Sequence, residues 1–322
     1  MRILVTGATG FVGKSLVPLL SQNGHLVRMA IRNVDNYILK DKSDSDDQFN
    51  FDLNSNDNNY ERLLNDVDVV IHLAARVHIL GEAGNEAAYK KINSIGTERL
   101  AKEAAERGVK RFIFLSSIKV NGEKNLIDAY GKSMPFNEGD VPYPQDTYAS
   151  SKLEGEVAIR NVCSSSDMDF VILRPVLVYG PGVKANFLLL LNAVNKYYPL
   201  PLASVRNKRS LIYVNNLADA ITKCVNTKKK LNKTFLISDF DISVPDLIRV
   251  IAQYLNKQAF LFSFPVGILK TVGLFMGKKQ AIDRLTESML VDNSRFREEL
   301  KWKPPHSLNE GVQATVDWYM QD

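Results

Sequence analysis

Residues 1–13, MRILVTGATGFVG, form the stretch that decides the fold. An apolar run ends at Gly7, and two further glycines follow at Gly10 and Gly13. This spacing predicts a strand, a tight turn and the start of a helix. In such a turn, backbone N–H groups and the helix dipole can hold the pyrophosphate of a dinucleotide. The same glycine pattern also occurs in purely structural turns, so other motifs in the chain are needed to distinguish a dinucleotide site from a structural turn.

Apolar runs alternate with helical patterns through the first half of the chain, which is typical of a parallel sheet with right-handed crossovers. The expected strands lie at 2–6, 26–31, 67–73, 111–116 and 170–174, with a short one at 48–52. The expected helices lie at 12–23, 58–64, 86–107 and 147–162. The fold class is therefore α/β, with a Rossmann doubly wound parallel sheet.

The pattern changes after Tyr179, where Gly180-Pro181-Gly182 breaks the chain. The remainder is irregular, and its expected helices lie at 186–196, 215–226 and 245–255. We expect a dinucleotide-binding domain at 1–179 and a smaller mixed substrate-binding lobe at 180–322, and we leave open a return of the chain to the sheet. Ligand is expected between the lobe and the carboxyl edge of the sheet.

The composition is that of an ordinary globular protein, with 322 residues, 45% hydrophobic and 24% charged. The net charge of +5 comes without a basic run long enough for nucleic acid, and it suits an anionic, diphosphate-bearing substrate. Cys163 and Cys224 are too few and too far apart for a disulfide framework. The start shows no signal-peptide pattern, so a cytoplasmic location is expected.

Residues 260–277 are the only stretch that resembles a membrane span. Pro265 and Lys270 interrupt it, so we expect a buried or lid-forming helix and no membrane span. The remaining alternative is an apolar surface that docks near a membrane enzyme.

Tyr148 and Lys152 stand four residues apart, which on a helix places a phenol and an ammonium on the same face. Together with the glycine turn, the pair indicates redox chemistry. Ser116-Ser117 ends the strand expected before that helix. In order and distance, these motifs resemble the extended branch of the short-chain dehydrogenase/reductase superfamily, the nucleotide-sugar epimerases, dehydratases and reductases. The resemblance covers essentially the whole chain.

The resemblance implies a catalytic group made of Ser117, Tyr148 and Lys152. Tyr148 would be the acid/base, Ser117 would hold the sugar oxygen, and Lys152 would bind the nicotinamide ribose and tune the phenol. A phenol titrates near 10, so a shift to neutrality of about 3 units corresponds to roughly 4 kcal/mol. An ammonium about 4 Å away supplies on the order of 4 kcal/mol. Lys152 is therefore expected to lower the pKa of Tyr148.

The resemblance also implies the contacts to the dinucleotide. These are Gly7, Thr9, Gly10, Phe11, Val12, Gly13, Arg32, Asp52, Leu53, Leu73, Ala74, Ala75, Asn93, Tyr148, Lys152 and Pro175. An acidic side chain at the tip of the second strand favours NAD, but Arg32 stands there, Arg28 could assist it, and Asp35 lies beyond the strand. A guanidinium suits a 2′-phosphate, so NADP is favoured over NAD. His72 and His78 lack companions at metal-ligand spacing, and no metal is expected.

Substrate contacts follow from the same resemblance. They are Ser116, Ser117, Lys119, Asn186, Arg209 and Asp292. Arg209 matches the arginine that binds the diphosphate, and a guanidinium suits paired phosphates. Dehydratases of this branch carry an Asp-Glu pair directly after the strand-end hydroxyl, whereas Ile118-Lys119 stands here. A dehydratase is therefore disfavoured. The segment 288–291 has no aromatic wall, so an N-acetyl group fits beside it.

These features point to an enzyme acting at carbon 4 of a UDP-sugar. Residues 117–122 and 182–186 resemble a surface-polysaccharide subgroup that is associated with reduction of UDP-4-keto-6-deoxy-N-acetylhexosamine. We therefore favour a UDP-4-keto-6-deoxy-N-acetylhexosamine 4-ketoreductase that consumes NADPH. The alternative is a UDP-hexose or UDP-N-acetylhexosamine 4-epimerase that retains NAD, and both reactions need the same residues. A non-catalytic dinucleotide-binding sensor is disfavoured, since Tyr148 and Lys152 are both present. Family members often form homodimers through two helices, here expected at 86–107 and 147–162.

Overall fold

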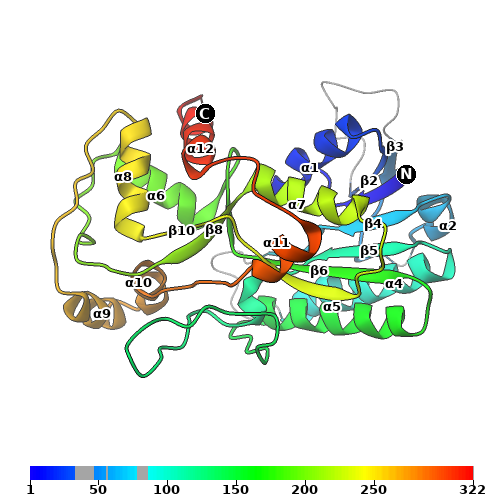
Figure 1. Cartoon of the computed structure of the whole chain (residues 1–322), viewed down its shortest axis with the longest axis horizontal. Helices are drawn as coiled ribbons and strands as arrows, with labels where there is room; N and C mark the ends of the chain where they lie inside the picture. Colours follow the sequence, from blue (N-terminus) through cyan, green and yellow to red (C-terminus); the bar gives the residue numbers. More distant parts are fainter. Residues whose placement is uncertain (33–46, 56, 78–85, 322) are drawn as a thin grey trace.

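A seven-stranded parallel sheet forms the centre of the molecule (Figure 1). The computed structural model describes residues 1–32, 47–55, 57–77 and 86–321. The strand order is β3-β2-β1-β4-β5-β6-β9. The strands are β1 Arg2–Thr6, β2 Leu26–Ile31, β3 Asp47–Asn50, β4 Val69–His72, β5 Arg111–Leu115, β6 Asp169–Pro175 and β9 Lys233–Ile237. The predicted doubly wound α/β fold is confirmed.

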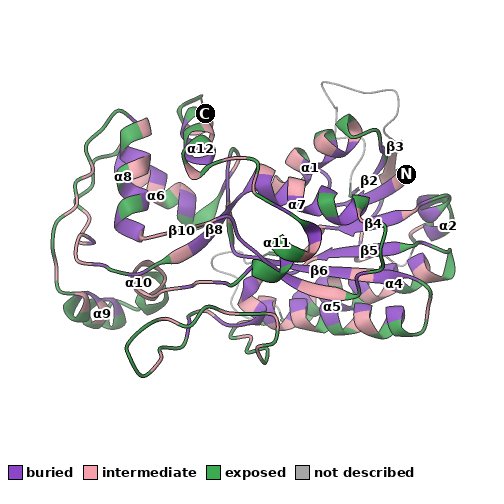
Figure 2. Cartoon of the chain, viewed as in Figure 1, coloured by how far each residue is buried: buried purple, intermediate pink, exposed green. Residues whose placement is uncertain are grey.

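Helices cover both faces of this sheet (Figure 1). On one face, α1 (Phe11–Gln22) packs against α7 (Val214–Asn226). On the other face, α4 (Thr97–Glu106) packs against α5 (Thr147–Ser164), and the short α2 (Tyr60–Leu64) lies beside α4. The sheet is therefore buried on both sides, as Figure 2 shows.

Alternation along each strand divides the buried side chains between the two faces. In β1, Ile3 and Val5 belong to the core beneath α1 and α7, whereas Leu4 belongs to the core beneath α2, α4 and α5. All three side chains are fully buried. The amino-terminal run is thus apolar without a polar face, because a strand in the middle of a parallel sheet has no exposed side.

A smaller lobe follows β6 and carries a three-stranded sheet of order β10-β8-β7. Its strands are β7 Leu177–Tyr179, β8 Arg209–Tyr213 and β10 Phe240–Ile242. Its helices are α6 Ala185–Asn195, α8 Val244–Tyr254, α9 Val266–Phe275, α10 Lys279–Thr286 and α12 Leu308–Gln321. Tyr179, Phe187 and Ile248 lie at the centre of its core. The helix α11, Ser294–Leu300, packs back against β9 of the main sheet.

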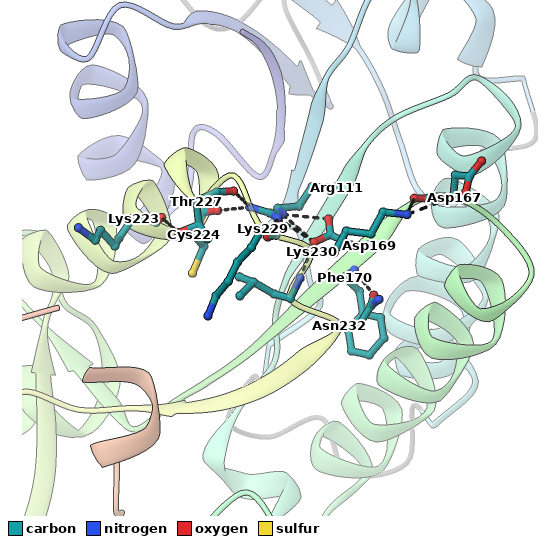
Figure 3. A network of polar contacts seen from close by, with 11 residues as sticks. Arg111, Asp167, Asp169, Phe170, Lys223, Cys224, Thr227, Lys229, Lys230 and Asn232 are labelled. Atoms are coloured by element: carbon teal, nitrogen blue, oxygen red, sulfur yellow. Dashed lines mark hydrogen bonds and ion pairs between the residues drawn. The ribbon is translucent and has the colours of Figure 1, made fainter. Parts of the chain in front are cut away.

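The chain returns from the lobe to the main sheet through β9, which pairs with β6 in parallel. Arg111, at the start of β5, forms an ion pair with Asp169, at the start of β6, with 2.8 Å between Nη2 and Oδ2. Its guanidinium also donates to three backbone carbonyls within 224–229, at 2.6 to 2.7 Å (Figure 3). These bonds fix the connection from α7 into β9 at the amino edge of the sheet.

The helix expected at 86–107 has a different form in its middle. The structure has α3 (Glu86–Tyr89), a π-helical stretch η1 (Lys90–Gly96) and then α4. Gly155 of α5 lies against it, where a Cβ would come within 2.6 Å of the Asn93 carbonyl oxygen. A periodicity of about 3.6 residues predicted a regular α-helix here. The wider π-helical turn occurs where the chain packs closely on α5 and the side-chain amide of Asn93 is buried.

The stretch 260–277 does contain a helix, α9, but a buried helix is the wrong description of it. Leu269 and Gly273 are buried, and most of its other apolar side chains are exposed. Across the described parts of the chain, every helix is too short or too polar to cross a bilayer.

Candidate active site

The glycine turn after β1 is shaped by close packing. Gly7 has φ of +69°, and a Cβ there would lie 2.7 Å from the backbone nitrogen of Ala74. A Cβ on Gly13 would lie 2.4 Å from the carbonyl oxygen of Ala8. Gly10 caps α1 without a side-chain hydrogen bond, so no side chain occupies the N–H groups of the first turn. This cradle fits the pyrophosphate of a dinucleotide.

The edge of the sheet beside β2 places the residues expected near adenine and ribose. Arg32 follows β2 directly and is exposed, whereas Asp35 lies outside the described residues. Asp52 follows β3, and one of its oxygens accepts from the backbone N–H of Asn54 at 2.9 Å. Leu53 is buried.

The expectation that Arg28 assists Arg32 is wrong. Its guanidinium is buried and donates to backbone carbonyls at the end of α2, including that of Leu63 at 3.0 Å. It also pairs with Asp47 of β3 at 3.3 Å. These acceptors bind both terminal nitrogens of the guanidinium at the sheet edge, whereas the buried Nε atom has no partner.

The carboxyl ends of β1, β4 and β6 meet along one edge, which brings together residues far apart in sequence. Leu73, Ala74 and Ala75 follow β4, and the N–H of Ala74 donates to the Thr6 hydroxyl at 3.2 Å. Pro175 ends β6.

Asn93 of η1 uses its amide within the protein. The oxygen accepts from the backbone N–H of Arg76 at 2.8 Å, and the nitrogen donates to the Arg76 carbonyl at 2.9 Å and the Ser151 hydroxyl at 3.0 Å. Asn93 therefore joins the loop after β4 to α5, the helix that carries Tyr148. Its expected place beside the cofactor stays a prediction.

His72 is a buried structural residue. Its ring nitrogens contact the hydroxyls of Thr6 at 2.6 Å and Thr97 at 2.9 Å. Burial, followed by the nearby charge of Lys152, lowers the pKa of His72 to about 3, so the ring is neutral. His78 lies outside the described residues, and those that are described hold no cluster of metal-ligating side chains.

Ser117, Tyr148 and Lys152 come together at the carboxyl edge of β5. Ser117 caps the short 3₁₀ helix η2 (Ile118–Val120), and the other two lie one turn apart on α5. The pKa of Tyr148 is raised to about 12, chiefly by burial. The Ser117 hydroxyl bonded to it acts in the opposite direction, and the charges of Asp146 and Tyr89 act in the same direction as burial.

Lys152 is almost completely buried, with its ammonium 4.2 Å from the centre of the Phe114 ring. Burial lowers its pKa to about 7, against the charge of Glu156. The expectation that Lys152 brings Tyr148 toward neutrality is thus not met in the chain itself. Desolvation dominates at both groups and favours the neutral phenol and the neutral amine.

Sequence reasoning missed the buried group one turn beyond Lys152. Glu156 accepts two bonds from Arg174, at 2.8 and 2.6 Å, and one from the Ser116 hydroxyl at 2.6 Å. Burial opposes ionisation, but the bonds and charge of Arg174 outweigh it and hold the pKa of Glu156 below its usual value. Ser116, expected to touch substrate, is buried and directed into this network. Glu156 stands one helical turn after Lys152 in the sequence, and this spacing was the signal that could have identified it.

Lys119 is also engaged inside the protein. Its ammonium pairs with Asp146 at 2.5 Å and with Glu123 at 3.1 Å. Asp146 caps α5 by accepting from the N–H of Ala149 at 2.7 Å. Lys119 therefore links the turn after Ser117 to the start of the helix that carries Tyr148.

The remaining expected substrate residues lie on or beside the lobe. Asn186 is exposed in the first turn of α6. Arg209 begins β8 and donates to the carbonyls of Arg284 and Glu287, and burial lowers its pKa to about 10. Asp292 is exposed and accepts from the N–H of Ser294 at 2.9 Å.

Comparison with known proteins is consistent with this architecture. The model of the NAD dependent epimerase/dehydratase family matches residues 3–238. A UDP-glucose 4-epimerase of Vibrio cholerae is 41% identical over 99% of this chain and 95% of its own length. A UDP-glucose 4-epimerase of Mycolicibacterium smegmatis is 27% identical over 99% of this chain and 98% of its own length.

Solved structures share the fold over the whole chain. A UDP-glucuronic acid 4-epimerase from Bacillus cereus in complex with NAD superposes with a TM-score of 0.79 at 23% identity, covering 100% of this chain and 97% of that one. A UDP-N-acetylglucosamine 4-epimerase from Bacillus cereus gives 0.75 at 20% identity, with both chains covered completely. The family model and the 41% identical relative show that the chain belongs to the NAD dependent epimerase/dehydratase family, as an enzyme of the extended short-chain dehydrogenase/reductase branch.

Proposed function

We propose that this protein is a 4-epimerase of UDP-hexoses or UDP-N-acetylhexosamines that retains NAD. The observation that carries the proposal is the 41% identity to a UDP-glucose 4-epimerase over nearly the whole of both chains. The side chains near Ser117 agree with it, because Ile118-Lys119 supplies no acid pair for elimination of water. The ketoreductase, our favoured interpretation of the sequence, has weaker support than this alternative.

The glycine cradle, the ends of β1 and β4, and Lys152 would hold the dinucleotide. When bound, NAD supplies reversible acceptance of a hydride from carbon 4 of the sugar. Tyr148 takes the proton of the carbon-4 hydroxyl when that carbon is oxidised, and returns it when the carbon is reduced from the other face. Ser117 holds the same oxygen by a hydrogen bond, and Arg209 of the lobe binds the diphosphate.

Tyr148 can act as a base only when its phenolate is stabilised. Burial is the main cause that raises its pKa to about 12, so a positive charge on Lys152 has to offset the desolvation. Substitution Tyr148→Phe is expected to lower kcat by about 10²- to 10⁴-fold, the range for a lost general acid–base. NAD content should be unchanged, because the phenol hydroxyl is not part of the glycine cradle.

The direct test is a sugar-isomer assay on UDP-glucose and UDP-N-acetylglucosamine, run beside NADPH absorbance with UDP-4-keto-6-deoxy-N-acetylglucosamine. An epimerase forms the 4-isomer without net loss of reduced cofactor, and the purified protein carries NAD. Oxidation of NADPH by the keto sugar, with no isomer from either hexose, would overturn the proposal.

Arg32 supports the 4-ketoreductase as a second candidate. It is exposed directly after β2, where a guanidinium suits the 2′-phosphate of NADP. Substitution Arg32→Ala separates the two candidates. A 2′-phosphate contact predicts weaker NADPH binding with NAD binding unchanged, whereas an NAD-dependent epimerase keeps its turnover.

We also propose a cytoplasmic homodimer, paired through α4 and α5. A groove between these helices is lined by Leu153, Val157 and Ala158 together with charged side chains. Val157 is half exposed within it. Light scattering should give the mass of two chains, and Val157→Glu should give the mass of one. An unchanged mass in the variant would exclude this pairing.

A further inference from the structure

The segment 288–292 lies between β8 of the lobe and the loop 121–146, which extends from the main sheet toward the lobe (Figure 1). The backbone of Met289 forms hydrogen bonds of 3.0 and 2.8 Å with the residues directly before and after Arg209. The Arg209 guanidinium donates to the Glu287 carbonyl at 3.3 Å and contacts the Met289 sulfur at 3.7 Å. The segment therefore holds both the backbone and the side chain of Arg209.

Asn125, in the loop 121–146, binds the other side of this segment. Its amide nitrogen donates to the Leu290 carbonyl at 3.0 Å, and its amide oxygen accepts from the Leu290 N–H at 2.6 Å. Asn125 is buried, and its backbone N–H donates to the Ser288 carbonyl at 3.3 Å. One side-chain amide thus satisfies both backbone groups of a single remote residue, as a neighbouring strand would.

The same loop begins beside the proposed catalytic group. Ser117 caps η2, and the carboxylate of Glu123 accepts from the Lys119 ammonium at 3.1 Å. Lys119 also pairs with Asp146, which caps the helix that carries Tyr148. One short stretch of chain therefore connects the proposed acid–base group with the segment that holds the arginine of the proposed diphosphate site.

Glu123 also acts on Arg209 through its charge. Burial lowers the pKa of Arg209 to about 10, the charge of Arg284 acts in the same direction, and the charge of Glu123 acts against both. The Glu123 carboxylate is thus close to the guanidinium that would bind the diphosphate. Two anions beside one guanidinium repel each other, so Glu123 stabilises the charge of Arg209 but opposes a diphosphate bound to it.

We propose that Asn125 is a positioning residue for Arg209, and that Glu123 limits the affinity of the same arginine for the diphosphate of the substrate. The inference rests on the proposed function, which places the diphosphate at Arg209 and the sugar at the catalytic group. A UDP-sugar has to reach both places at once, so the position of Arg209 relative to the catalytic group has to be fixed. The pairing of Asn125 with Leu290 fixes it, because it ties the loop to the segment that holds Arg209.

The two residues are expected to change the affinity for UDP in opposite directions. Asn125→Ala frees the segment beside Arg209, and the Kd for UDP should rise about tenfold, the effect of losing one hydrogen bond to a charged group. The diphosphate is held alike in the ground state and the transition state, so KM should rise while kcat stays within about threefold. Glu123→Gln removes a like charge and should lower the Kd for UDP about threefold, with a smaller effect at high salt.

Titration calorimetry with UDP measures this affinity without turnover, and steady-state kinetics gives KM and kcat. Asn216→Ala is the matched control, because the Asn216 amide also binds both backbone groups of one remote residue, His306, each at 2.9 Å. Asn216 lies on α7 and has no bond to the segment 288–292 among the contacts described above. Urea unfolding should show that both asparagine variants are destabilised, whereas Asn216→Ala should keep its Kd for UDP within about twofold.

An unchanged Kd for UDP in Asn125→Ala, or an equal loss of affinity in Asn216→Ala, would overturn the positioning role. Weaker binding of UDP by Glu123→Gln would overturn the role of its charge. The Glu123 side chain is partly exposed, so this variant should fold even where Asn125→Ala does not. UDP binding that follows these expectations without any isomer formation would contradict the epimerase and leave the inference standing, whereas no binding of UDP by the unaltered protein would contradict both.

Discussion

Two buried arginine–carboxylate pairs lie at opposite edges of the main sheet. Arg111–Asp169 lies at the amino edge, and the other bonds of Arg111 go to backbone carbonyls that lead into β9. Arg174–Glu156 lies at the carboxyl edge, and its other bonds go to side chains, including Ser116 next to Ser117. The same chemical pair therefore serves chain connection at one edge and the proposed catalytic group at the other.

Breaking the pair at the amino edge should affect stability alone and most strongly. Asp169→Ala leaves the Arg111 guanidinium without its carboxylate, and removal of one partner of a buried pair costs about 3–5 kcal/mol. Urea unfolding should show this loss. The turnover of the folded fraction should stay within about twofold, since Asp169 lies at the far edge from Tyr148. A proportional loss of turnover would show that the two edges are coupled.

Breaking the pair at the carboxyl edge should change stability and turnover together. Glu156→Gln keeps the shape but removes the charge that faces Arg174, and we expect a loss of about 3 kcal/mol. The Ser116 hydroxyl loses a charged acceptor, so the position of Ser117 becomes less defined and kcat should fall about tenfold. Steady-state kinetics with NAD content as the control measures this. An unchanged kcat would limit Glu156 to a structural role.

A buried carboxylate without an arginine partner shows what the arginines do. Asp239 is held by the Tyr213 N–H and the Asn216 amide, both at 2.7 Å, and its Oδ1 atom has no partner. Burial raises its pKa to about 6, whereas that of Glu156 is lowered. Because the folded pKa lies above the unfolded one, this group contributes stability that is present below about pH 4 and is lost as pH rises through about 6.

Asp239→Asn removes that titration. Its unfolding free energy should exceed that of the unaltered protein by about 1–3 kcal/mol above pH 7, and the difference should shrink toward pH 4. Urea unfolding across this pH range is the measurement. A variant that is less stable at every pH would mean that hydrogen bonding at Asp239 outweighs its desolvation.

The smallest expected effect concerns Lys119, which offsets the charge of Asp146 at the start of α5. Asp146 and Tyr89 raise the pKa of Tyr148, so Lys119→Met should raise it further. The ascending limb of the pH–rate profile, which reports ionisation of the Tyr148 base, should move upward by less than about one pH unit, and Lys119→Arg should restore it. A higher KM without a pH shift would instead assign Lys119 to substrate, as the sequence predicted.

Local spacing made part of this structure predictable. The glycines at 7, 10 and 13 and the pair Tyr148–Lys152 are each determined within a few residues, and they predicted the fold and the family. Glu156–Arg174 joins residues that are 18 positions apart, and the connection from Arg111 to the β9 approach spans more than 110. Such pairs depend on which strands become neighbours, and periodicity does not contain that information.

Two other predictions were limited for different reasons. Apolar composition predicted a helix within 260–277, but composition does not tell which side of it other elements cover. Arg32 favoured NADP, whereas the family is described as NAD dependent, and one guanidinium at a strand tip is a weak guide to a reaction. The favoured ketoreductase depended on that residue and on a subgroup resemblance, and the 41% identity to a UDP-glucose 4-epimerase gives the alternative the better support.

The π-helical stretch at 90–96 changes the rotation about the helix axis between the residues before it and the residues after it. Each residue of an α-helix turns the chain by about 100°, so one extra residue held in a wide turn re-aims everything that follows it. Deleting one residue there would restore a regular helix but rotate Asn93 relative to α4. A one-residue deletion there would separate Arg76 from Ser151, which Asn93 joins, while leaving both ends of the helix intact.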